Sequence, residues 1–208
     1  MIRVHHLNMS RSQRILWLLE ELERPYEIVS YRRDRRTMRA PAALKQVHPL
    51  GKSPVIEDDG RVFAETGVIV EYLVATYGPR LAPPPTGDDH WRYRYWMHYA
   101  EGSLMSQLLL KLVADRLGLL AWPIRKTIRE QLRLHLDFLE TEAARSPWLA
   151  GEALSAADIM MSFPLEAAAA RAGLDASRPQ LWGLLQRMRQ RPAYGRALSR
   201  TAAAFSAA

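Results

Sequence analysis

Cysteine is absent from the 208 residues of this chain. Its absence excludes disulfide bonds, zinc sites built on thiolates and a cysteine nucleophile, and with them any mixed-disulfide redox chemistry. A thiol that takes part in the chemistry must therefore come with the substrate. The chain also has no run of about 18 apolar residues and no apolar export segment after Met1, so we expect a cytoplasmic protein that does not span a membrane.

Basic residues outnumber acidic ones, with 29 Lys and Arg against 22 Asp and Glu and a net charge of +7. Much of the excess lies between Arg32 and Arg39. A nucleic-acid surface combines such charge with aromatic side chains or a recognition motif, but only Tyr31 adjoins this run and no helix-turn-helix or zinc signature accompanies it. We therefore interpret the run as a solvated loop and expect no nucleic-acid partner, although a positive field can steer small anions.

The first residues follow a strand, helix, strand order. Strands are predicted at 2–7 and 26–31, with a helix at 12–23 between them. In this helix apolar residues recur with the helical period on one face, and the other face carries Arg14, Glu20, Glu21 and Glu23. The pattern is typical of a helix that lies on a sheet.

A short helix, a hairpin and a longer helix complete the first part of the chain. The short helix is expected at about 41–46. Strands at 54–57 and 61–64 are joined by Asp58-Asp59-Gly60, a turn sequence that tolerates positive φ. A helix at 65–77 then closes a unit with the order βαβαββα.

Prolines mark the clearest break in the chain. Gly78-Pro79 ends the preceding helix, and the three consecutive prolines at 83–85 cannot continue one. We therefore predict a first domain at 1–79, a proline-rich linker at 80–87 and a second domain at 88–208.

The second domain has helical patterns throughout. Apolar residues spaced by three and four predict two long helices, over 91–112 and 124–139. Ser155 followed by Asp158 resembles a capping box and predicts a buried helix behind it, with Pro164 inside. Pro179 and Pro192 are each placed to open a short terminal helix.

One segment indicates a binding slot for a small peptide. The Ser53-Pro54 bond precedes a strand, and a cis bond there would turn the Ser53 backbone outward to pair with an extended ligand. Glu65 and Thr66 stand at the start of the helix at 65–77, where a hydroxyl and free amides favour a carboxylate. The ligand should therefore be a small peptide that carries an acid.

Three segments together resemble the glutathione transferase family: 49–54 (PLGKSP), 65–73 (ETGVIVEYL) and 155–159 (SAADI). The resemblance spans the whole chain. It implies an α/β thioredoxin-like N-terminal domain that holds glutathione, followed by an all-α domain that supplies most of the electrophile pocket, in a homodimer. Residues 7–15 (LNMSRSQRI) look like the serine-using, theta-like bacterial and fungal members, which implies Ser10 as the catalytic residue.

Ser10 would donate a hydrogen bond to the glutathione sulfur rather than attack the substrate. Ser12 is its rival, because it could be this donor or the N-cap of the first helix, and we favour the cap. An ordinary turn residue is the alternative for Ser10.

The same resemblance assigns the other glutathione contacts. Lys52 would reach the glycyl carboxylate, although a solvated lysine explains it nearly as well. Ser53 would bind through its main chain beside Pro54. Glu65, otherwise a first-turn acid favoured by the helix dipole, and Thr66 would form the acid slot. Glu101 falls about where theta-like relatives have an acid that reaches the γ-glutamyl amine in the partner subunit.

Aromatic and histidine side chains are interpreted as structural. Trp91, Tyr95, Trp96 and Tyr99 could line the electrophile pocket, but their helical spacing favours packing in the core or at the dimer surface. His98 and His135 are also interpreted as structural, and His5, His6 and His48 have no second group at metal-ligand spacing, so we expect no metal.

These observations predict a glutathione transferase that activates the thiol of glutathione for attack on a small hydrophobic electrophile. Isomerisation, dehalogenation and peroxide reduction begin from the same thiolate and remain open as further activities. A non-catalytic module of this fold that binds a partner is the first alternative, and an intracellular carrier of apolar ligands is the second.

Overall fold

A computed structural model of the protein describes residues 1–206. The chain divides into two compact units. The first contains residues 1–80 and the C-terminal residues from 189 onward, and the second contains residues 81–188.

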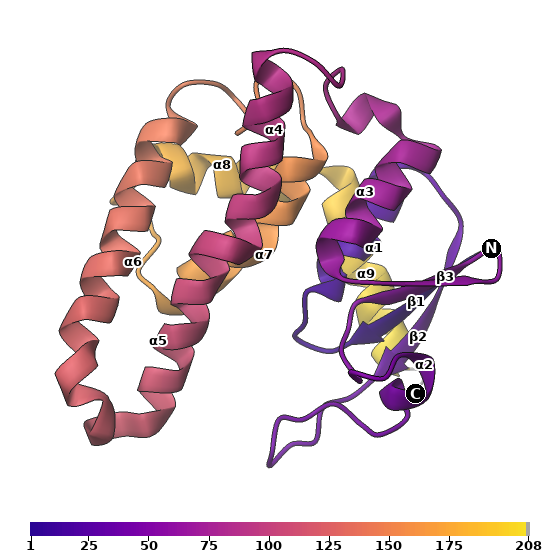
Figure 1. The fold of residues 1–208 in the computed structure, drawn as a ribbon, viewed down its shortest axis with the longest axis horizontal. Helices are drawn as coiled ribbons and strands as arrows, with labels where there is room; N and C mark the ends of the chain where they lie inside the picture. The colour runs from indigo at the N-terminus through magenta and orange to yellow at the C-terminus, as the bar shows by residue number, and fades with distance from the viewer. Residues whose placement is uncertain (207–208) are drawn as a thin grey trace. The chain divides into compact units, whose positions relative to one another are not determined.

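A four-stranded mixed sheet forms the centre of the first unit (Figure 1). Its strands lie in the order β2-β1-β3-β4, and their bounds are β1 Ile2–Leu7, β2 Tyr26–Tyr31, β3 Val55–Asp58 and β4 Arg61–Ala64. β1 is parallel to β2 and antiparallel to β3, and β3 is antiparallel to β4. The turn between β3 and β4 has positive φ at Asp59 and Gly60, as the predicted hairpin requires.

Four α-helices accompany this sheet: α1 Ser12–Glu21, α2 Leu44–Val47, α3 Thr66–Tyr77 and α9 Pro192–Ser206. α1 contacts β1, α3 and α9, and α9 also contacts β2. The short helix predicted at 41–46 begins three residues later than expected. The predicted thioredoxin-like first domain is confirmed.

The polar face of α1 is buried rather than solvated. Arg14, Glu20 and Glu21 are all less than 10% exposed. Arg191 pairs with Glu21 through two nitrogens, at 2.5 and 2.8 Å, and Arg196 donates to Glu20 at 2.8 Å. Arg191, just before α9, and Arg196 within α9 therefore cover the two glutamates that the sequence places on the polar side of α1.

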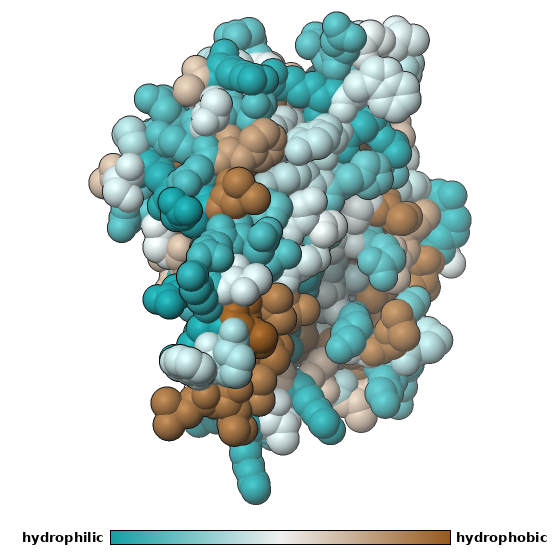
Figure 2. Space-filling model, turned by 60° about the vertical axis from the view of Figure 1, so that its left-hand side comes forward, coloured by the Kyte–Doolittle hydropathy of each residue, from teal (hydrophilic) through white to brown (hydrophobic). Residues whose placement is uncertain are grey.

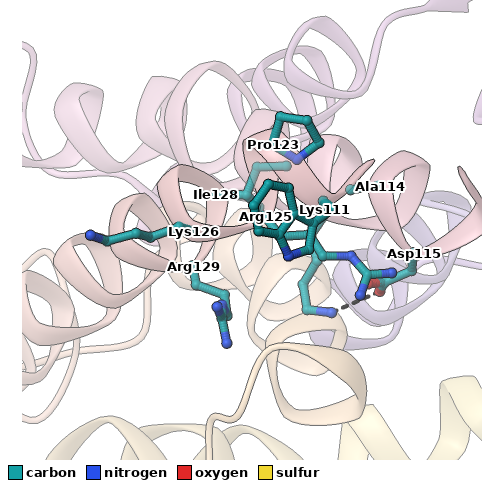
Figure 3. Close-up of a pocket in the computed structure, with 9 residues that line it drawn as sticks. Lys111, Ala114, Asp115, Pro123, Arg125, Lys126, Ile128 and Arg129 are labelled. Carbon is teal, nitrogen blue, oxygen red and sulfur yellow. Dashed lines mark hydrogen bonds and ion pairs between the residues drawn. The ribbon is translucent and has the colours of Figure 1, made fainter. Parts of the chain in front are cut away.

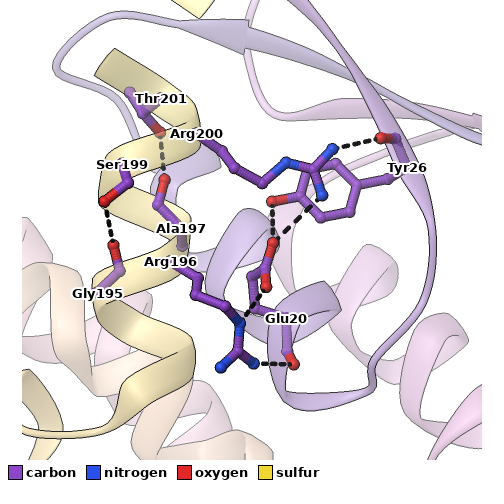
Figure 4. Close-up of polar contacts among 8 residues, drawn as sticks. All are labelled: Glu20, Tyr26, Gly195, Arg196, Ala197, Ser199, Arg200 and Thr201. Atoms are coloured by element: carbon purple, nitrogen blue, oxygen red, sulfur yellow. Dashed lines mark hydrogen bonds and ion pairs between the residues drawn. The ribbon is translucent and has the colours of Figure 1, made fainter. Parts of the chain in front are cut away.

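Figure 4 shows how Glu20 joins three elements. Its carboxylate accepts hydrogen bonds from Arg196 and Arg200 of α9 and from the Tyr26 hydroxyl of β2. Burial pushes the pKa of Glu20 upward, but these hydrogen bonds outweigh it and hold the pKa below its usual value. The carboxylate therefore stays ionised between its arginines.

The position of α9 differs from the predicted domain division. The sequence places all of 88–208 in the helical domain, whereas the structure groups α9 with the first unit. The helix predicted to start at Pro192 is present, and Arg191 just before it and Arg196 within it pair with Glu21 and Glu20 of α1.

The second unit is helical. Its elements are α4 Asp88–Tyr99, η2 Ala100–Met105, α5 Ser106–Leu117, η3 Gly118–Ala121, α6 Trp122–Ala143, α7 Ala156–Arg171 and α8 Pro179–Arg189, whose last residue is grouped with the first unit. The helix predicted over 91–112 is not continuous, because the six residues of η2 form a π-helix between α4 and α5. Helix α7 is buried along most of its length behind the predicted capping box.

Apolar side chains are exposed where α5 turns into α6. Leu119, Leu120 and Trp122 are between 76% and 87% exposed. Figure 2 shows a hydrophobic patch on this face of the molecule. Among residues 1–206, no helix is long and apolar enough to cross a membrane.

Candidate active site

Three segments of the chain meet at one end of the sheet. The strand register pairs His5 with Val55, and Val55 with Ala64. Because neighbouring strands here run antiparallel, the chain leaves β1 toward Ser10 at the same end where it enters β3 through Pro54. It leaves β4 for Glu65 and α3 at that end too. Residues that the sequence separates by more than 40 positions are thus brought together.

Two serines and a histidine form a continuous line of hydrogen bonds in this region. The Oγ atoms of Ser10 and Ser12 are 2.6 Å apart, and Ser12 Oγ is 2.8 Å from His6 Nδ1. The Ser12 backbone N–H also donates to Ser10 Oγ, at 3.3 Å. We refer to Ser10, Ser12 and His6 as the hydroxyl–imidazole line.

The line separates the roles of the two serines. Ser12 is completely buried, whereas Ser10 keeps 6% of its surface exposed. The prediction of Ser12 as the N-cap of the first helix is wrong, because Arg11 occupies the cap position and no side chain caps the helix. The Ser12 hydroxyl is instead held between Ser10 and His6.

Ser53 approaches the line from the start of β3. The peptide bond between Ser53 and Pro54 is cis. The Ser53 hydroxyl donates to the His5 carbonyl at 2.8 Å and accepts from the Leu7 N–H at 3.3 Å. Its Oγ lies 3.5 Å from Ser10 Oγ. Because the Ser53 hydroxyl proton is donated to the His5 carbonyl, Ser53 Oγ can only accept a hydrogen bond from the Ser10 hydroxyl.

His6 is buried at the inner end of the line. It is 2% exposed, and its ring lies 5.4 Å from the ring of Phe205 in α9, measured between centroids. Burial lowers the pKa of His6 to about 4, so the imidazole is neutral at pH 7. Its Nε2 atom has no hydrogen-bond partner among residues 1–206.

The other predicted contacts in the first unit surround the same end of the sheet. Glu65 has a φ of 68°, which residues other than glycine rarely adopt. Such strained backbone is typical of functional positions. Thr66, the first residue of α3, is buried, whereas Glu65 and Lys52 are exposed. The exposed charges are therefore available to a ligand.

Glu101 belongs to the second unit, where it is half-buried in the π-helical segment η2. Such segments are frequent at functional sites. The four nearby aromatic residues divide into two groups: Trp96 and Tyr99 are buried, and Trp91 and Tyr95 are 69% and 46% exposed. Packing in the core therefore describes Trp96 and Tyr99, whereas packing of Trp91 and Tyr95 at a dimer surface stays a prediction.

Models of two domains match this chain, the N-terminal domain of glutathione S-transferase at residues 8–76 and its C-terminal domain at residues 97–187. Glutathione S-transferase 3 of Schizosaccharomyces pombe is 40% identical over 183 residues, which are 81% of this chain and 74% of that protein. The chain belongs to the glutathione S-transferase family.

Further similarities agree with this assignment. Glutathione S-transferase 1 of Saccharomyces cerevisiae is 34% identical over 189 residues, which are 80% of each protein. The crystal structure of a glutathione S-transferase from Actinobacillus pleuropneumoniae has a TM-score of 0.87 and 35% identity, and covers 97% of this chain and 93% of that one. The predicted family and the prediction of an enzyme are confirmed, whereas the serine-using subclass stays a prediction.

A pocket of about 670 Å³ lies in the second unit between α5 and α6. Trp122, Pro123 and Ile128 supply apolar walls, and its acid, Asp115, is paired with Lys111 at 2.7 Å (Figure 3). None of the predicted glutathione contacts lines it. We therefore place the candidate active site of this glutathione transferase at Ser10 and not in this pocket.

Sequence reasoning missed the role of His6. It considered His5 and His6 only as metal ligands, and no group of three or more His, Cys, Asp or Glu side chains that could hold a metal ion occurs within residues 1–206. The alternation of side chains along β1 was the available signal, since it places neighbouring histidines on opposite faces. His5 contacts Tyr31 and Glu57, and His6 faces Ser12.

Proposed function

We propose that this protein binds glutathione at the end of the sheet near Ser10 and holds its sulfur as a thiolate for attack on a small hydrophobic electrophile. The observation that carries the proposal is the convergence of Ser10, Ser53 and Glu65 at one sheet end, beside the N-terminus of α1. A serine hydroxyl and an anion-favouring helix end are then available to one ligand.

The chemistry requires a lowered thiol pKa. A free thiol with a pKa of about 8.5 is only a few per cent ionised at pH 7. Lowering it by about two units needs roughly 2.7 kcal/mol of preferential stabilisation of the anion. A hydrogen bond to a charged acceptor contributes about 1.5–3 kcal/mol and a helix N-terminus about 0.3–1 kcal/mol, so the two together suffice.

The remaining contacts would position the tripeptide. Thr66 and the first amides of α3 would bind one carboxylate, Lys52 would pair with the other, and the Ser53 backbone would hydrogen-bond the extended peptide. Glu101 would bind the γ-glutamyl amine in the partner subunit of a homodimer. The net charge of +7 would favour the approach of this anionic ligand.

The decisive experiment measures the ultraviolet absorbance of the bound thiolate against pH, for the wild type and for Ser10→Ala. We expect Ser10→Ala to raise the pKa of the bound thiol by about one to two units, because it removes a charge-assisted hydrogen bond. Affinity for glutathione should change little, since the peptide contacts remain.

Ser162→Ala is the matched control. Ser162 is a buried serine of α7 whose hydroxyl donates to the Ile159 carbonyl at 2.7 Å, so its loss tests the general cost of removing such a group. The proposal is wrong if the wild type shows no thiolate absorbance with millimolar glutathione. It is also wrong if Ser10→Ala and Ser162→Ala have the same bound-thiol pKa.

A second pair of variants tests the acid slot. Thr66→Ala should weaken glutathione binding by about tenfold, because the ligand carboxylate loses one hydrogen bond. Thr66→Ser keeps the hydroxyl and should bind almost as the wild type does. Equal affinities of Thr66→Ala and wild type would exclude this residue from the slot.

A further inference from the structure

The interior of the first unit contains polar groups that the proposed function does not yet use. Ser12 and His6 lie behind Ser10, out of contact with solvent, and they carry two hydrogen-bonding protons and one neutral ring. Each proton in such a line can point in either of two directions. The direction decides whether Ser10 can donate to a ligand at all.

We propose that His6 and Ser12 are positioning residues that turn the Ser10 proton outward. In this arrangement His6 Nδ1–H donates to Ser12 Oγ, and Ser12 Oγ–H donates to Ser10 Oγ. The Ser10 proton is then left for the sulfur of glutathione, so this inference rests on the proposed function.

The hydrogen-bonding capacity of Ser10 supports the outward direction. A serine hydroxyl donates once and accepts twice. Ser10 Oγ already accepts from the Ser12 N–H at 3.3 Å, and a second bond accepted from the Ser12 hydroxyl at 2.6 Å would fill its acceptor capacity. The proton of Ser10 would then have Ser53 Oγ, 3.5 Å away, as its partner until a ligand arrives.

The inward direction would defeat the proposed chemistry. In the inward direction, Ser10 donates to Ser12 Oγ and Ser12 donates to His6 Nδ1. The proton of the neutral His6 ring must then be on Nε2. That atom has no hydrogen-bond partner within the described chain, and an unpaired buried N–H is costly. Ser10 would have no proton left to stabilise a thiolate.

His6 is not the base that ionises the thiol in this arrangement. Its ring is buried against Phe205, and a cation there would have no acidic hydrogen-bond partner among the described residues. The neutral ring instead donates one hydrogen bond in a fixed direction. Hydrogen bonds in a line polarise one another, so the inner two strengthen the outermost one.

The tautomer of His6 tests the inference without any ligand. Nitrogen-15 NMR of the labelled full-length protein distinguishes a protonated from an unprotonated ring nitrogen, and the signals missing from His6→Leu identify those of His6. We expect a proton on Nδ1 and none on Nε2, both before and after glutathione is added. A proton on Nε2 in the glutathione complex would overturn the proposal.

The bound thiol provides the second test. Ser12→Ala removes the donor to Ser10 and should raise the bound-thiol pKa, so that the thiol is about two- to fivefold more protonated at neutral pH. His6→Leu should have a smaller effect of the same sign, because Ser12 can still donate to Ser10. Ser162→Ala should leave the value unchanged.

The direction in which Ser12→Ala changes the bound-thiol pKa is decisive. Under the inward direction this variant would free the Ser10 proton and lower the bound-thiol pKa, so a lower or unchanged value contradicts the proposal. Failure of the proposed function would be recognised separately, as unchanged thiol ionisation in Ser10→Ala or as absence of glutathione binding by the wild type.

Discussion

The two units each bury a titratable side chain, His6 in the first and Asp158 in the second, but they use its hydrogen-bonding groups differently. Asp158 accepts from the Leu149 N–H, the Ser155 N–H and the Ser155 hydroxyl, at 2.8 to 2.9 Å. His6 has one partner, Ser12, and a second ring nitrogen without one in residues 1–206. A fully partnered buried group holds a fold together, whereas the line that begins at His6 ends at Ser10, next to the proposed ligand.

The largest expected effect tests the structural half of this comparison. Asp158→Ala should lower the free energy of unfolding by about 3–5 kcal/mol, because it leaves the backbone N–H groups of Leu149 and Ser155 buried and unpaired. Asp158→Asn keeps one acceptor oxygen and should lower the free energy of unfolding by less. Chemical denaturation measures both, and a loss below about 1 kcal/mol for Asp158→Ala would show that the cap is dispensable.

As the pH falls, the contributions of His6 and Asp158 to the stability of the fold should change in opposite directions. The pKa of His6 is lowered from 6.5 to about 4, so its contribution to stability is complete above pH 6.5 and is lost as the pH falls toward 4. The difference corresponds to roughly 3 kcal/mol. Burial raises the pKa of Asp158 from 3.8 to about 6, against the hydrogen bonds from Ser155 and Leu149, so folding gains stability as the pH falls from 6 toward 3.8.

Variants separate these two contributions, which partly cancel in the wild type. His6→Leu should be less sensitive to acid than the wild type between pH 6.5 and 4, and Asp158→Asn should be more sensitive. Unfolding midpoints measured at pH 7 and pH 4.5 provide the comparison. Parallel pH profiles for both variants and the wild type would exclude either group as a source of pH dependence.

Ion pairs give a third comparison between the units. Arg191→Ala should lower the free energy of unfolding by about 1–2 kcal/mol, because the buried Glu21 carboxylate loses its arginine and keeps the hydrogen bond from the Trp17 indole N–H, while solvent screens part of the loss. The exposed Lys126–Glu130 pair of α6, at 3.9 Å, is the control, and Lys126→Ala should change stability by less than about 0.5 kcal/mol. Similar losses in both variants would mean that the buried Arg191–Glu21 pair stabilises the fold no more than an exposed pair does.

The smallest expected effect concerns two buried serines, one in each unit. Ser162→Ala should lower the free energy of unfolding by about 1 kcal/mol, since it removes one hydrogen bond to a carbonyl. It should not change thiol ionisation, whereas Ser12→Ala should. A change in the bound-thiol pKa in Ser162→Ala would remove the distinction between a structural and a positioning serine.

Local patterns were sufficient for much of the first unit. The predicted strands 2–7 and 26–31 agree with β1 and β2, and the Asp59-Gly60 turn has the positive φ values that its residues tolerate. The cap before α7 was likewise readable, because Ser155 and Asp158 lie three residues apart. Each of these features depends on neighbours in the sequence.

Features set by distant residues were not predicted. Nothing near Glu20 and Glu21 indicates that arginines about 170 positions later will cover them. The π-helical segment η2 also escaped prediction, since the apolar spacing continues through it. The cap preference of serine also misled the interpretation of Ser12, whose hydroxyl binds His6, six residues earlier, instead.

By itself, the sequence determined the order of strands and helices, the family resemblance and the choice of Ser10 as the residue to test. These follow from periodicity, turn chemistry and short motifs, which are encoded within a few residues. Only the tertiary structure decided that Ser12 and His6 stand behind Ser10 and that α9 belongs with the first unit. The place of α9 depends on contacts between residues about 170 positions apart. The line joins near neighbours, but the burial of His6 against Phe205 arises only when α9 packs onto the sheet.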